Sequence, residues 1–120
     1  NENLKLYQKN NLIKKIHKTS KVFEEYFDKI TEIEIVGDIR QKGMLMGIEL
    51  VKNKKTKVPI YSKKSLNKIF FEEGKKNGIY LRTLGNVVML VPPLAISEKE
   101  LDLLLNRTVK TIKSVQTQVM

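Results

Sequence analysis

One arginine has the setting of a ligand-binding residue. Arg82 lies in the stretch GIYLRTLGNVVMLVPP, residues 78–93, where a short predicted strand meets a turn at Leu84-Gly85-Asn86. A guanidinium is planar and permanently charged, so an arginine held at the end of a rigid sheet can bind a carboxylate through two parallel hydrogen bonds. Spacing alone favours the plainer alternative, an exposed hairpin arginine without a ligand. Carboxylate binding at Arg82 is therefore a hypothesis at this point.

The remaining residue types do not make up a complete active site. The chain has no cysteine, which excludes disulfides, thiolate metal sites and a cysteine nucleophile. Its single histidine, His17, lies on a lysine-rich predicted helix with no second ligand or carboxylate at helical spacing, so neither a metal site nor a Ser/His/Asp triad is predicted. No glycine-rich phosphate loop and no His-Glu-x-x-His motif occurs. The neighbouring carboxylates Glu24-Glu25 and Glu72-Glu73 point in different directions on their helices and are predicted to be solubilising charge.

The chain is strongly basic, with a formal net charge of +10. Such a charge raises the hypothesis of nucleic-acid binding, because neutralising phosphates gives strong binding without sequence preference. The basic residues are twenty lysines and only three arginines, however, and the lysines are spread from Lys5 to Lys113 without one dense tract. A solvated surface is the better interpretation of so many lysines, and the run KNKKTK at 52–57 is predicted to be a solvated loop. We keep a lysine-rich nucleic-acid module as an alternative and expect no nucleic-acid partner.

Hydrophobic periodicity predicts the elements that position Arg82. A long helix with one apolar stripe is predicted from about residue 4 to residue 29. The period then becomes that of an extended chain, which predicts two adjacent antiparallel strands at 34–40 and 44–51. Gly43 and Gly47 mark places where the backbone bends or another backbone approaches closely, and ordinary sheet geometry explains both without a ligand.

Capping and turn residues predict the second half of the chain. Ser62 is the predicted N-cap of a helix that ends at Asn77-Gly78, a pair with the chemistry of a left-handed C-terminal stop. The uninterrupted apolar run from Val87 to Val91 is typical of a strand covered on both faces. Ser97 to Glu100 forms a predicted capping box for the last helix.

The predicted order is helix, two strands, helix, two strands, helix. Paired strands with helices between them indicate an α+β fold, a mainly antiparallel sheet with helices on one side. No repeat or low-complexity linker interrupts the pattern, so residues 1–120 are predicted to form a single domain. No apolar segment approaches the roughly 20 residues needed to span a bilayer. The lack of cysteine fits a reducing cytoplasm, and because the first residue is not methionine we expect a piece of a longer polypeptide.

Three stretches resemble a known family. GDIRQKGMLMGIELV, residues 37–51, resembles the small-domain strand pair of class III (ornithine-type) pyridoxal-phosphate aminotransferases. Residues 78–97 resemble one branch more narrowly, the branch that acts in biotin biosynthesis, through an Arg-x-Leu-Gly-Asn turn, an apolar strand and Pro-Pro. Residues 10–27 resemble the helix that leads into the family's small domain. The resemblance covers nearly the whole chain and implies the C-terminal small domain of a fold-type I pyridoxal-phosphate transferase.

This resemblance implies a reaction and a role for particular residues. The implied reaction moves an amino group from S-adenosylmethionine to 8-amino-7-oxononanoate through pyridoxal 5′-phosphate, in a homodimeric enzyme. Arg82 is implied to bind the substrate carboxylate, and Gly43 and Gly47 match positions at the rim of the active site. Arg40 also matches a family arginine, for which we expect a structural role in tying strand ends together. An aminotransferase of the ornithine or 4-aminobutyrate type stays open, because Arg82 could hold the carboxylate of several substrates.

The resemblance also implies what this chain lacks. The family's Schiff-base lysine and its other cofactor-binding residues belong to a large domain that would precede Asn1, and none of the twenty lysines occupies a comparable motif. We expect no catalytic, cofactor-binding or metal-binding residue here, and neither tight binding of pyridoxal phosphate nor transamination by the chain alone. Separation from a large domain would leave apolar area exposed, so we also expect self-association or modest stability.

Overall fold

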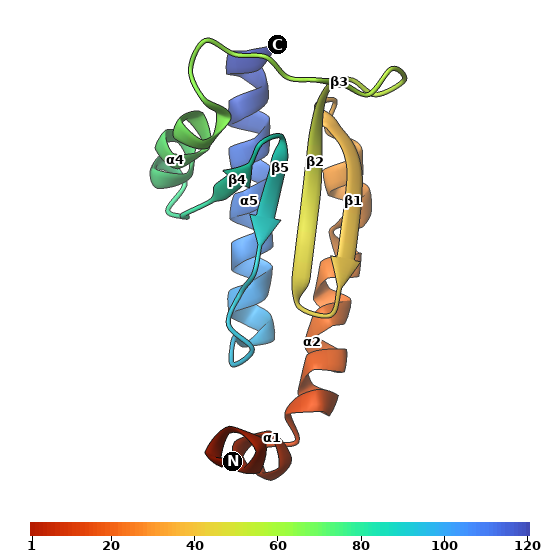
Figure 1. The fold of residues 1–120 in the computed structure, drawn as a ribbon, viewed down its shortest axis with the longest axis vertical. Coiled ribbons are helices and arrows are strands. Elements are labelled where there is room, and N and C mark those ends of the chain that lie inside the picture. Colours follow the sequence, from red (N-terminus) through yellow and green to blue (C-terminus); the bar gives the residue numbers. More distant parts are fainter.

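An asparagine breaks the N-terminal helical region. The computed structural model describes all 120 residues. The helix predicted over residues 4–29 is three helices, α1 (Glu2–Lys9), α2 (Leu12–Glu25) and α3 (Phe27–Thr31). Asn11 adopts the left-handed conformation, with φ 49° and ψ 43°, which asparagine tolerates better than most residues. The prediction of one continuous helix was therefore wrong, and α1 bends away from the rest of the molecule without burying any residue (Figure 1).

The strands form one mainly antiparallel sheet, as predicted. Four of them lie in the order β1-β2-β5-β4, and the short β3 pairs with the end of β2. The two hairpins β1-β2 and β4-β5 meet where β2 pairs with β5, and all three pairings are antiparallel. The chain therefore brings the N-terminal and C-terminal hairpins into a single layer (Figure 1). The strand bounds are β1 Val36–Lys42, β2 Leu45–Asn53, β3 Val58–Pro59, β4 Arg82–Leu84 and β5 Val87–Leu90.

The helix before the second hairpin begins three residues later than predicted. α4 (Leu66–Lys76) has Ser65 as its N-cap, and the Ser65 hydroxyl accepts a hydrogen bond from the Lys68 amide at 3.3 Å. The assignment of Ser62 as the cap was therefore wrong. Two lysines follow Ser62, whereas the buried face of α4 begins only at Leu66, so the helix begins where its side chains reach the core. α4 ends at Lys76 with Asn77 as its C-cap, and Gly78 follows with φ 71°, the left-handed stop that the Asn77-Gly78 pair predicted.

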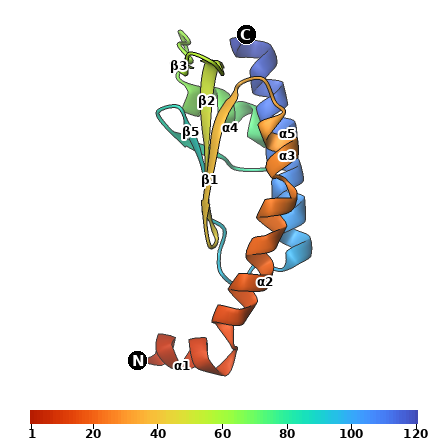
Figure 2. The same ribbon diagram turned by 90° about the vertical axis from the view of Figure 1, so that its right-hand side faces the viewer.

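The last helix covers one face of the sheet. α5 (Glu98–Val119) begins with the predicted capping box, in which the Ser97 hydroxyl accepts from the Glu100 amide and the Glu100 carboxylate accepts from the Ser97 amide. In side view, α2, α3 and α5 lie on the same side of the sheet, which confirms the predicted fold class (Figure 2). No helix combines the length and the apolar character needed to cross a membrane.

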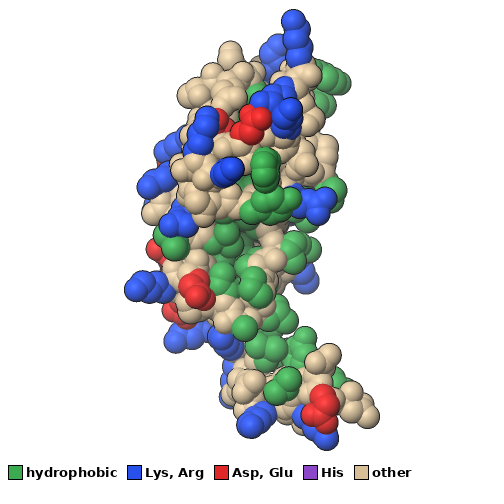
Figure 3. Space-filling model, turned by 90° about the vertical axis from the view of Figure 1, so that its left-hand side faces the viewer, with side chains coloured by type: hydrophobic (Ala, Val, Ile, Leu, Met, Phe, Trp, Pro, Cys, Tyr) green, Lys and Arg blue, Asp and Glu red, His purple; other side chains and the backbone are tan.

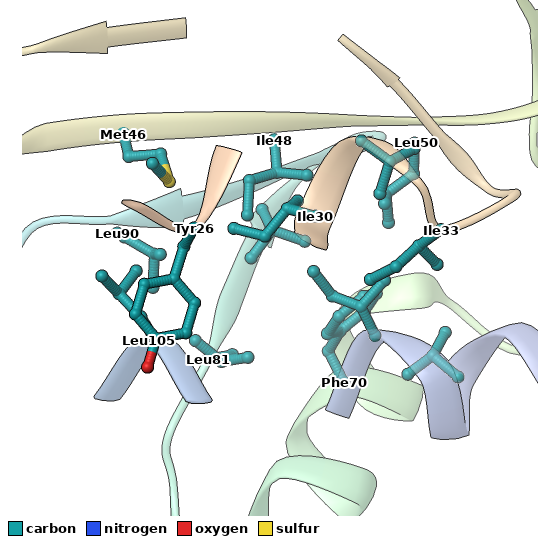
Figure 4. Packing of buried hydrophobic residues seen from close by; sticks show 14 of the residues in the cluster. Tyr26, Ile30, Ile33, Met46, Ile48, Leu50, Phe70, Leu81, Leu90 and Leu105 are labelled. Carbon is teal, nitrogen blue, oxygen red and sulfur yellow. The ribbon is translucent and has the colours of Figure 1, made fainter. Parts of the chain in front are cut away.

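The hydrophobic core lies between this helical layer and the sheet. Side chains from β2 and β5 point toward side chains from α3, α4 and α5 and toward Tyr26, which lies between α2 and α3 (Figure 4). One cluster of 22 buried residues joins all of these elements. Its members that are 0% exposed are Phe23, Ile30, Ile35, Met46, Ile48, Leu50, Phe70, Val88, Leu101, Leu105, Ile112 and Val115.

The opposite face of the sheet carries no helix. In β5 the burial alternates between buried and half-buried positions, and Val91 just beyond it is 68% exposed. The prediction that Val87 to Val91 is covered on both faces was therefore wrong for this chain, because the helices pack on one face only. The uncovered face is apolar along β5, whereas β1 and β2 bring Asp38, Arg40 and Glu49 to it.

Candidate functional site

β4 presents Arg82 on the helix-free face of the sheet. Its neighbours Leu81 and Thr83 are buried, with 2% and 9% of their surface exposed, whereas Arg82 is exposed. Alternation along an extended chain explains this contrast, because successive side chains point to opposite faces. No acidic side chain lies within ion-pair distance of the Arg82 guanidinium. Its backbone belongs to the edge strand β4, which pairs with β5, and its charge is free to meet a ligand.

The strand register aligns Arg82 with a second arginine. Arg82 pairs with Met89, Met89 with Gly47, and Gly47 with Arg40. Directly paired residues of antiparallel strands point to the same face, so these four residues form one row across the helix-free face. Neighbouring strands lie about 4.8 Å apart, which separates the two arginine backbones by about 14 Å.

The two arginines of this row differ in their charge environment. The Arg40 guanidinium contacts Asp38 of its own strand, Nε to Oδ2, at 3.0 Å. It also reaches Glu49 of β2, Nη2 to Oε2, at 4.0 Å. The hydrogen bond from Arg40 lowers the pKa of Asp38 below its usual value. Two carboxylates therefore offset the charge of Arg40 and link it to the neighbouring strand, whereas Arg82 has no such partner. Only Arg82 offers an unneutralised guanidinium in this row.

An apolar groove lies beside Arg82. It has a volume of about 390 Å³ and runs along the sheet edge where β5 extends beyond the three residues of β4. Figure 3, which faces this edge, shows hydrophobic side chains gathered in the middle of the face, with lysine and arginine side chains mainly around them. Arg82 is the only charged residue of the lining, whose other members are Tyr80, Met89, Leu90, Val91, Pro92, Pro93, Ile96 and Leu104.

The two candidate rim glycines lie in different places. Gly47 lies in the arginine row, and a Cβ added to it would meet the Val87 Cγ1 at 3.4 Å, an ordinary contact. Gly43 lies in the turn between β1 and β2 with φ 57° and open space around it. The turn therefore requires a glycine at position 43. Gly47 leaves the middle of the arginine row without a side chain. Their place at an active-site rim stays a prediction.

The histidine and the paired carboxylates of α4 were predicted to have no ligand. His17 is exposed on α2. Glu72 and Glu73 do not form a pair: Glu72 contacts Lys64, whereas Glu73 is buried and accepts hydrogen bonds from Lys76 and Gln118. The burial of Glu73 contradicts its assignment as solubilising charge. The reason is that α4 packs against α5 at this position, which sequence spacing within α4 does not reveal.

Sequence reasoning missed most of the groove. Tyr80 lies two residues before Arg82, and period-2 spacing in an extended segment could have placed both on one side of the chain. The Tyr80 ring is 67% exposed and meets the Phe71 ring edge to face, with 5.7 Å between ring centroids. Ile96 and Leu104 come from a loop and from α5, and no local signal connects either of them with Arg82.

The comparisons with known proteins identify the class. The Aminotransferase class-III family matches residues 1–112, so this chain belongs to the class III aminotransferases. It is 42% identical over 111 residues to the adenosylmethionine-8-amino-7-oxononanoate aminotransferase of Methanocaldococcus jannaschii, which covers 92% of this chain and 24% of that protein. The enzyme of the same name from Geobacter sulfurreducens is 36% identical over 112 residues, covering 93% and 25%. The gamma aminobutyrate transaminase 3 of Solanum lycopersicum is 30% identical over 118 residues, covering 98% and 23%. The chain thus spans about a quarter of the length of these relatives.

Solved structures agree with the fold. The crystal structure of the Methanocaldococcus jannaschii enzyme matches with a TM-score of 0.84 and 40% identity, over 92% of this chain and 25% of that one. An omega transaminase from Pseudomonas jessenii matches with a TM-score of 0.87 over 98% of this chain and 26% of that one, at 23% identity, which supports the fold alone. These matches confirm the predicted α+β architecture of a small domain in a fold-type I transaminase.

The residues of this chain fit the family's cofactor poorly. Pyridoxal phosphate chemistry requires an amine held in an enclosed pocket that lowers its pKa and aims it. All twenty lysines are exposed, and hydrogen bonding to Glu73 raises the pKa of Lys76, the opposite direction. We therefore derive no chemical step through the cofactor from these residues.

Proposed function

We propose that this chain is the C-terminal part of an aminotransferase that transfers an amino group from S-adenosylmethionine to 8-amino-7-oxononanoate in biotin biosynthesis. In this proposal the rest of the polypeptide holds pyridoxal phosphate and performs the chemistry, and the present chain binds the substrate carboxylate. Support comes from relatives of that name, which include those at 42% and 36% identity. The full enzyme would be a cytoplasmic homodimer, and the chain alone would be inactive.

The observation that carries the proposal is a free guanidinium above an apolar groove. 8-amino-7-oxononanoate has a carboxylate at one end, a chain of methylenes, and its reacting carbonyl at the other end. Arg82 can bind the carboxylate through a charge-assisted, bidentate contact, and the apolar lining beside it suits the methylenes. Arg40 suits this role less well, because Asp38 and Glu49 already contact its guanidinium.

The uncovered face of the sheet supports the proposal that another part of the polypeptide packs against it. Val87 and Met89 are half-buried and Val91 is exposed, although their sequence is typical of a strand covered on both faces. In the proposal, the remaining three quarters of the polypeptide covers this face and Arg82 points into the space between. Gly47 then lies at the rim of that space because it adds no side chain to the row, and Arg40 ties β1 to β2.

A second candidate is another class III aminotransferase. The relative from Solanum lycopersicum, at 30% identity, is a gamma aminobutyrate transaminase, and a guanidinium binds the carboxylate of 4-aminobutyrate or ornithine equally well. Assaying the complete enzyme with both groups of substrates separates the two candidates. The nucleic-acid alternative has no observation in its favour beyond the charge.

The proposal is tested in the complete polypeptide by steady-state kinetics with 8-amino-7-oxononanoate. A hydrogen bond to a charged group contributes about 1.5–3 kcal/mol, so Arg82→Ala should lower kcat/KM by roughly ten- to over a hundredfold. Arg82→Lys should restore only part of the loss, because an ammonium lacks the planar fork. Arg40→Ala is the matched control, since it removes an arginine from the same row and should change kcat/KM less than about threefold. Equal kinetics of Arg82→Ala and the wild type would remove the assignment.

A further inference from the structure

The strand that carries Arg82 has little support from the sheet. β4 is only three residues long and lies at the sheet edge, where it pairs with β5 alone. Edge strands leave a row of backbone groups without a strand partner. A guanidinium on such a strand can bind a carboxylate with defined geometry only if other contacts fix the backbone.

A side chain of α4 fixes one end of this segment. The Thr83 amide donates a hydrogen bond to Asn67 Oδ1 at 3.1 Å. Thr83 directly follows Arg82, and the bond takes the place of a ladder bond that a further strand would supply. Asn67 is the second residue of α4, directly after the Ser65 cap and Leu66, so its backbone is held by the helix.

A side chain of α5 fixes the other end. The Arg107 Nη1 group donates a hydrogen bond to the Gly78 carbonyl oxygen at 2.8 Å. Gly78 has φ 71°, and a Cβ added there would lie 3.0 Å from the same nitrogen, so the guanidinium sits directly over this backbone. Between the two anchors, Leu81 is buried in the core with 2% of its surface exposed. The segment from Gly78 to Thr83 is therefore held at three points, and Arg82 lies between two of them.

The two anchoring helices are themselves joined. Asn77 at the end of α4 donates to the Thr111 hydroxyl of α5 at 3.2 Å, and Gln118 of α5 donates to the Glu73 carboxylate of α4 at 2.5 Å. Both anchors therefore belong to one packed unit, and they hold the segment relative to the same frame.

We propose that Asn67 and Arg107 are positioning residues for Arg82, and that through it they set the affinity of the enzyme for carboxylated substrates. This inference rests on the proposed function, because it needs Arg82 to bind the substrate carboxylate. Neither residue lines the groove beside Arg82, so they act on the substrate only through the backbone of β4. A displacement on the order of 1 Å far from the reacting atoms can cost up to a hundredfold in rate.

The test uses the complete enzyme with 8-amino-7-oxononanoate and with its uncharged primary amide. Asn67→Ala should raise KM for the carboxylate about three- to tenfold with little change in kcat, because it weakens binding without touching the chemistry. KM for the amide should stay within about twofold. Asn67→Asp keeps an acceptor oxygen for the Thr83 amide and should restore most of the affinity. Arg107→Ala should act like Asn67→Ala, with Arg107→Lys as its conservative variant.

A double variant separates this inference from the proposed function. In an Arg82→Ala background, Asn67→Ala should have no further effect on KM, because the residue it positions is gone. If Arg82→Ala itself leaves KM unchanged, the proposed function fails and the inference fails with it. If Arg82→Ala raises KM while Asn67→Ala does not, or if Asn67→Ala weakens the carboxylate and the amide equally, the positioning role is refuted alone. Should Asn67→Ala not fold, Asn67→Ser replaces it, since the shorter side chain cannot bridge the same gap.

Discussion

Replacing Gly74 by alanine should destabilise the protein, although helix propensity alone predicts the reverse. Gly74 is buried within α4, where alanine is favoured over glycine by about 0.8–1 kcal/mol. A Cβ at this position, however, would lie 2.7 Å from the Ile79 carbonyl oxygen, which is backbone and cannot rotate away. The Ile79 amide also donates to the Gly74 carbonyl at 2.9 Å as part of the helix C-terminal stop. The two residues therefore cannot separate without losing that bond.

The two effects differ enough in size to decide the sign. Overpacking of this kind costs about 1–3 kcal/mol, and the weakened hydrogen bond adds about 1 kcal/mol. After the gain in propensity, Gly74→Ala should be less stable by about 1–3 kcal/mol, which lowers Tm by roughly 4–12 °C. Far-ultraviolet circular dichroism on heating measures this change. Gly47→Ala is the control, because its Cβ meets Val87 at an ordinary 3.4 Å, and it should change stability by less than about 0.5 kcal/mol. A higher Tm for Gly74→Ala would refute the packing argument.

Three further predictions follow from buried polar groups and from the uncovered face. Burial and the hydrogen bond to Asp102 at 2.6 Å raise the pKa of Tyr26 from 10.0 to about 12, so its contribution to folding stability is complete below pH 10 and disappears as pH rises through 12. Tyr26→Phe should cost about 1 kcal/mol of stability at neutral pH. In an ultraviolet absorbance titration it should also remove the tyrosine that ionises at the highest pH. Hydrogen bonds from Lys76 and Gln118 lower the pKa of Glu73, so its contribution to folding stability is complete above about pH 4.5 and declines as pH falls below that value. Denaturant unfolding at several pH values should therefore show that the free energy of unfolding falls less steeply with decreasing pH in Glu73→Gln than in the wild type. Light scattering should show self-association of the chain alone as concentration rises, and a monomer at every concentration would contradict this expectation.

The sequence predicted the elements whose signals are local. The capping box at Ser97, the stop at Gly78 and the alternation of β2 each depend on residues within a few positions of one another, and all three are present. The break at Asn11 was missed because the apolar stripe begins only at Leu12, so the residues before it gave no periodic signal for where that helix starts. Whether a helix bends there depends on what α1 packs against, and periodicity within the helix does not contain that information.

The candidate site was predicted only in part. The strand pattern around Arg82 was enough to predict that it lies in a sheet, next to the core. The row that joins Arg82 to Arg40 depends on register between strands about forty residues apart in the chain, and the groove wall at Leu104 depends on how α5 crosses the sheet edge. Both are tertiary contacts, and no local pattern encodes them.

The proposed roles of Arg40 and Arg82 rest on the difference in their charged neighbours. Arg40 has two acidic partners in the sheet, so removing it mainly disturbs contacts within the protein. Arg82 has none, and a free guanidinium beside an apolar groove has the chemistry that the proposed carboxylate site requires. The two arginines of the row thus have different predicted roles because only Arg40 has acidic partners.

The most direct measurement is a crystal structure of the complete enzyme bound to 8-amino-7-oxononanoate. The account predicts that both carboxylate oxygens lie within about 3 Å of the Arg82 guanidinium nitrogens, with the methylene chain against the apolar lining beside it. A carboxylate bound elsewhere, with Arg82 in solvent or paired with an acidic residue of the protein, would contradict it.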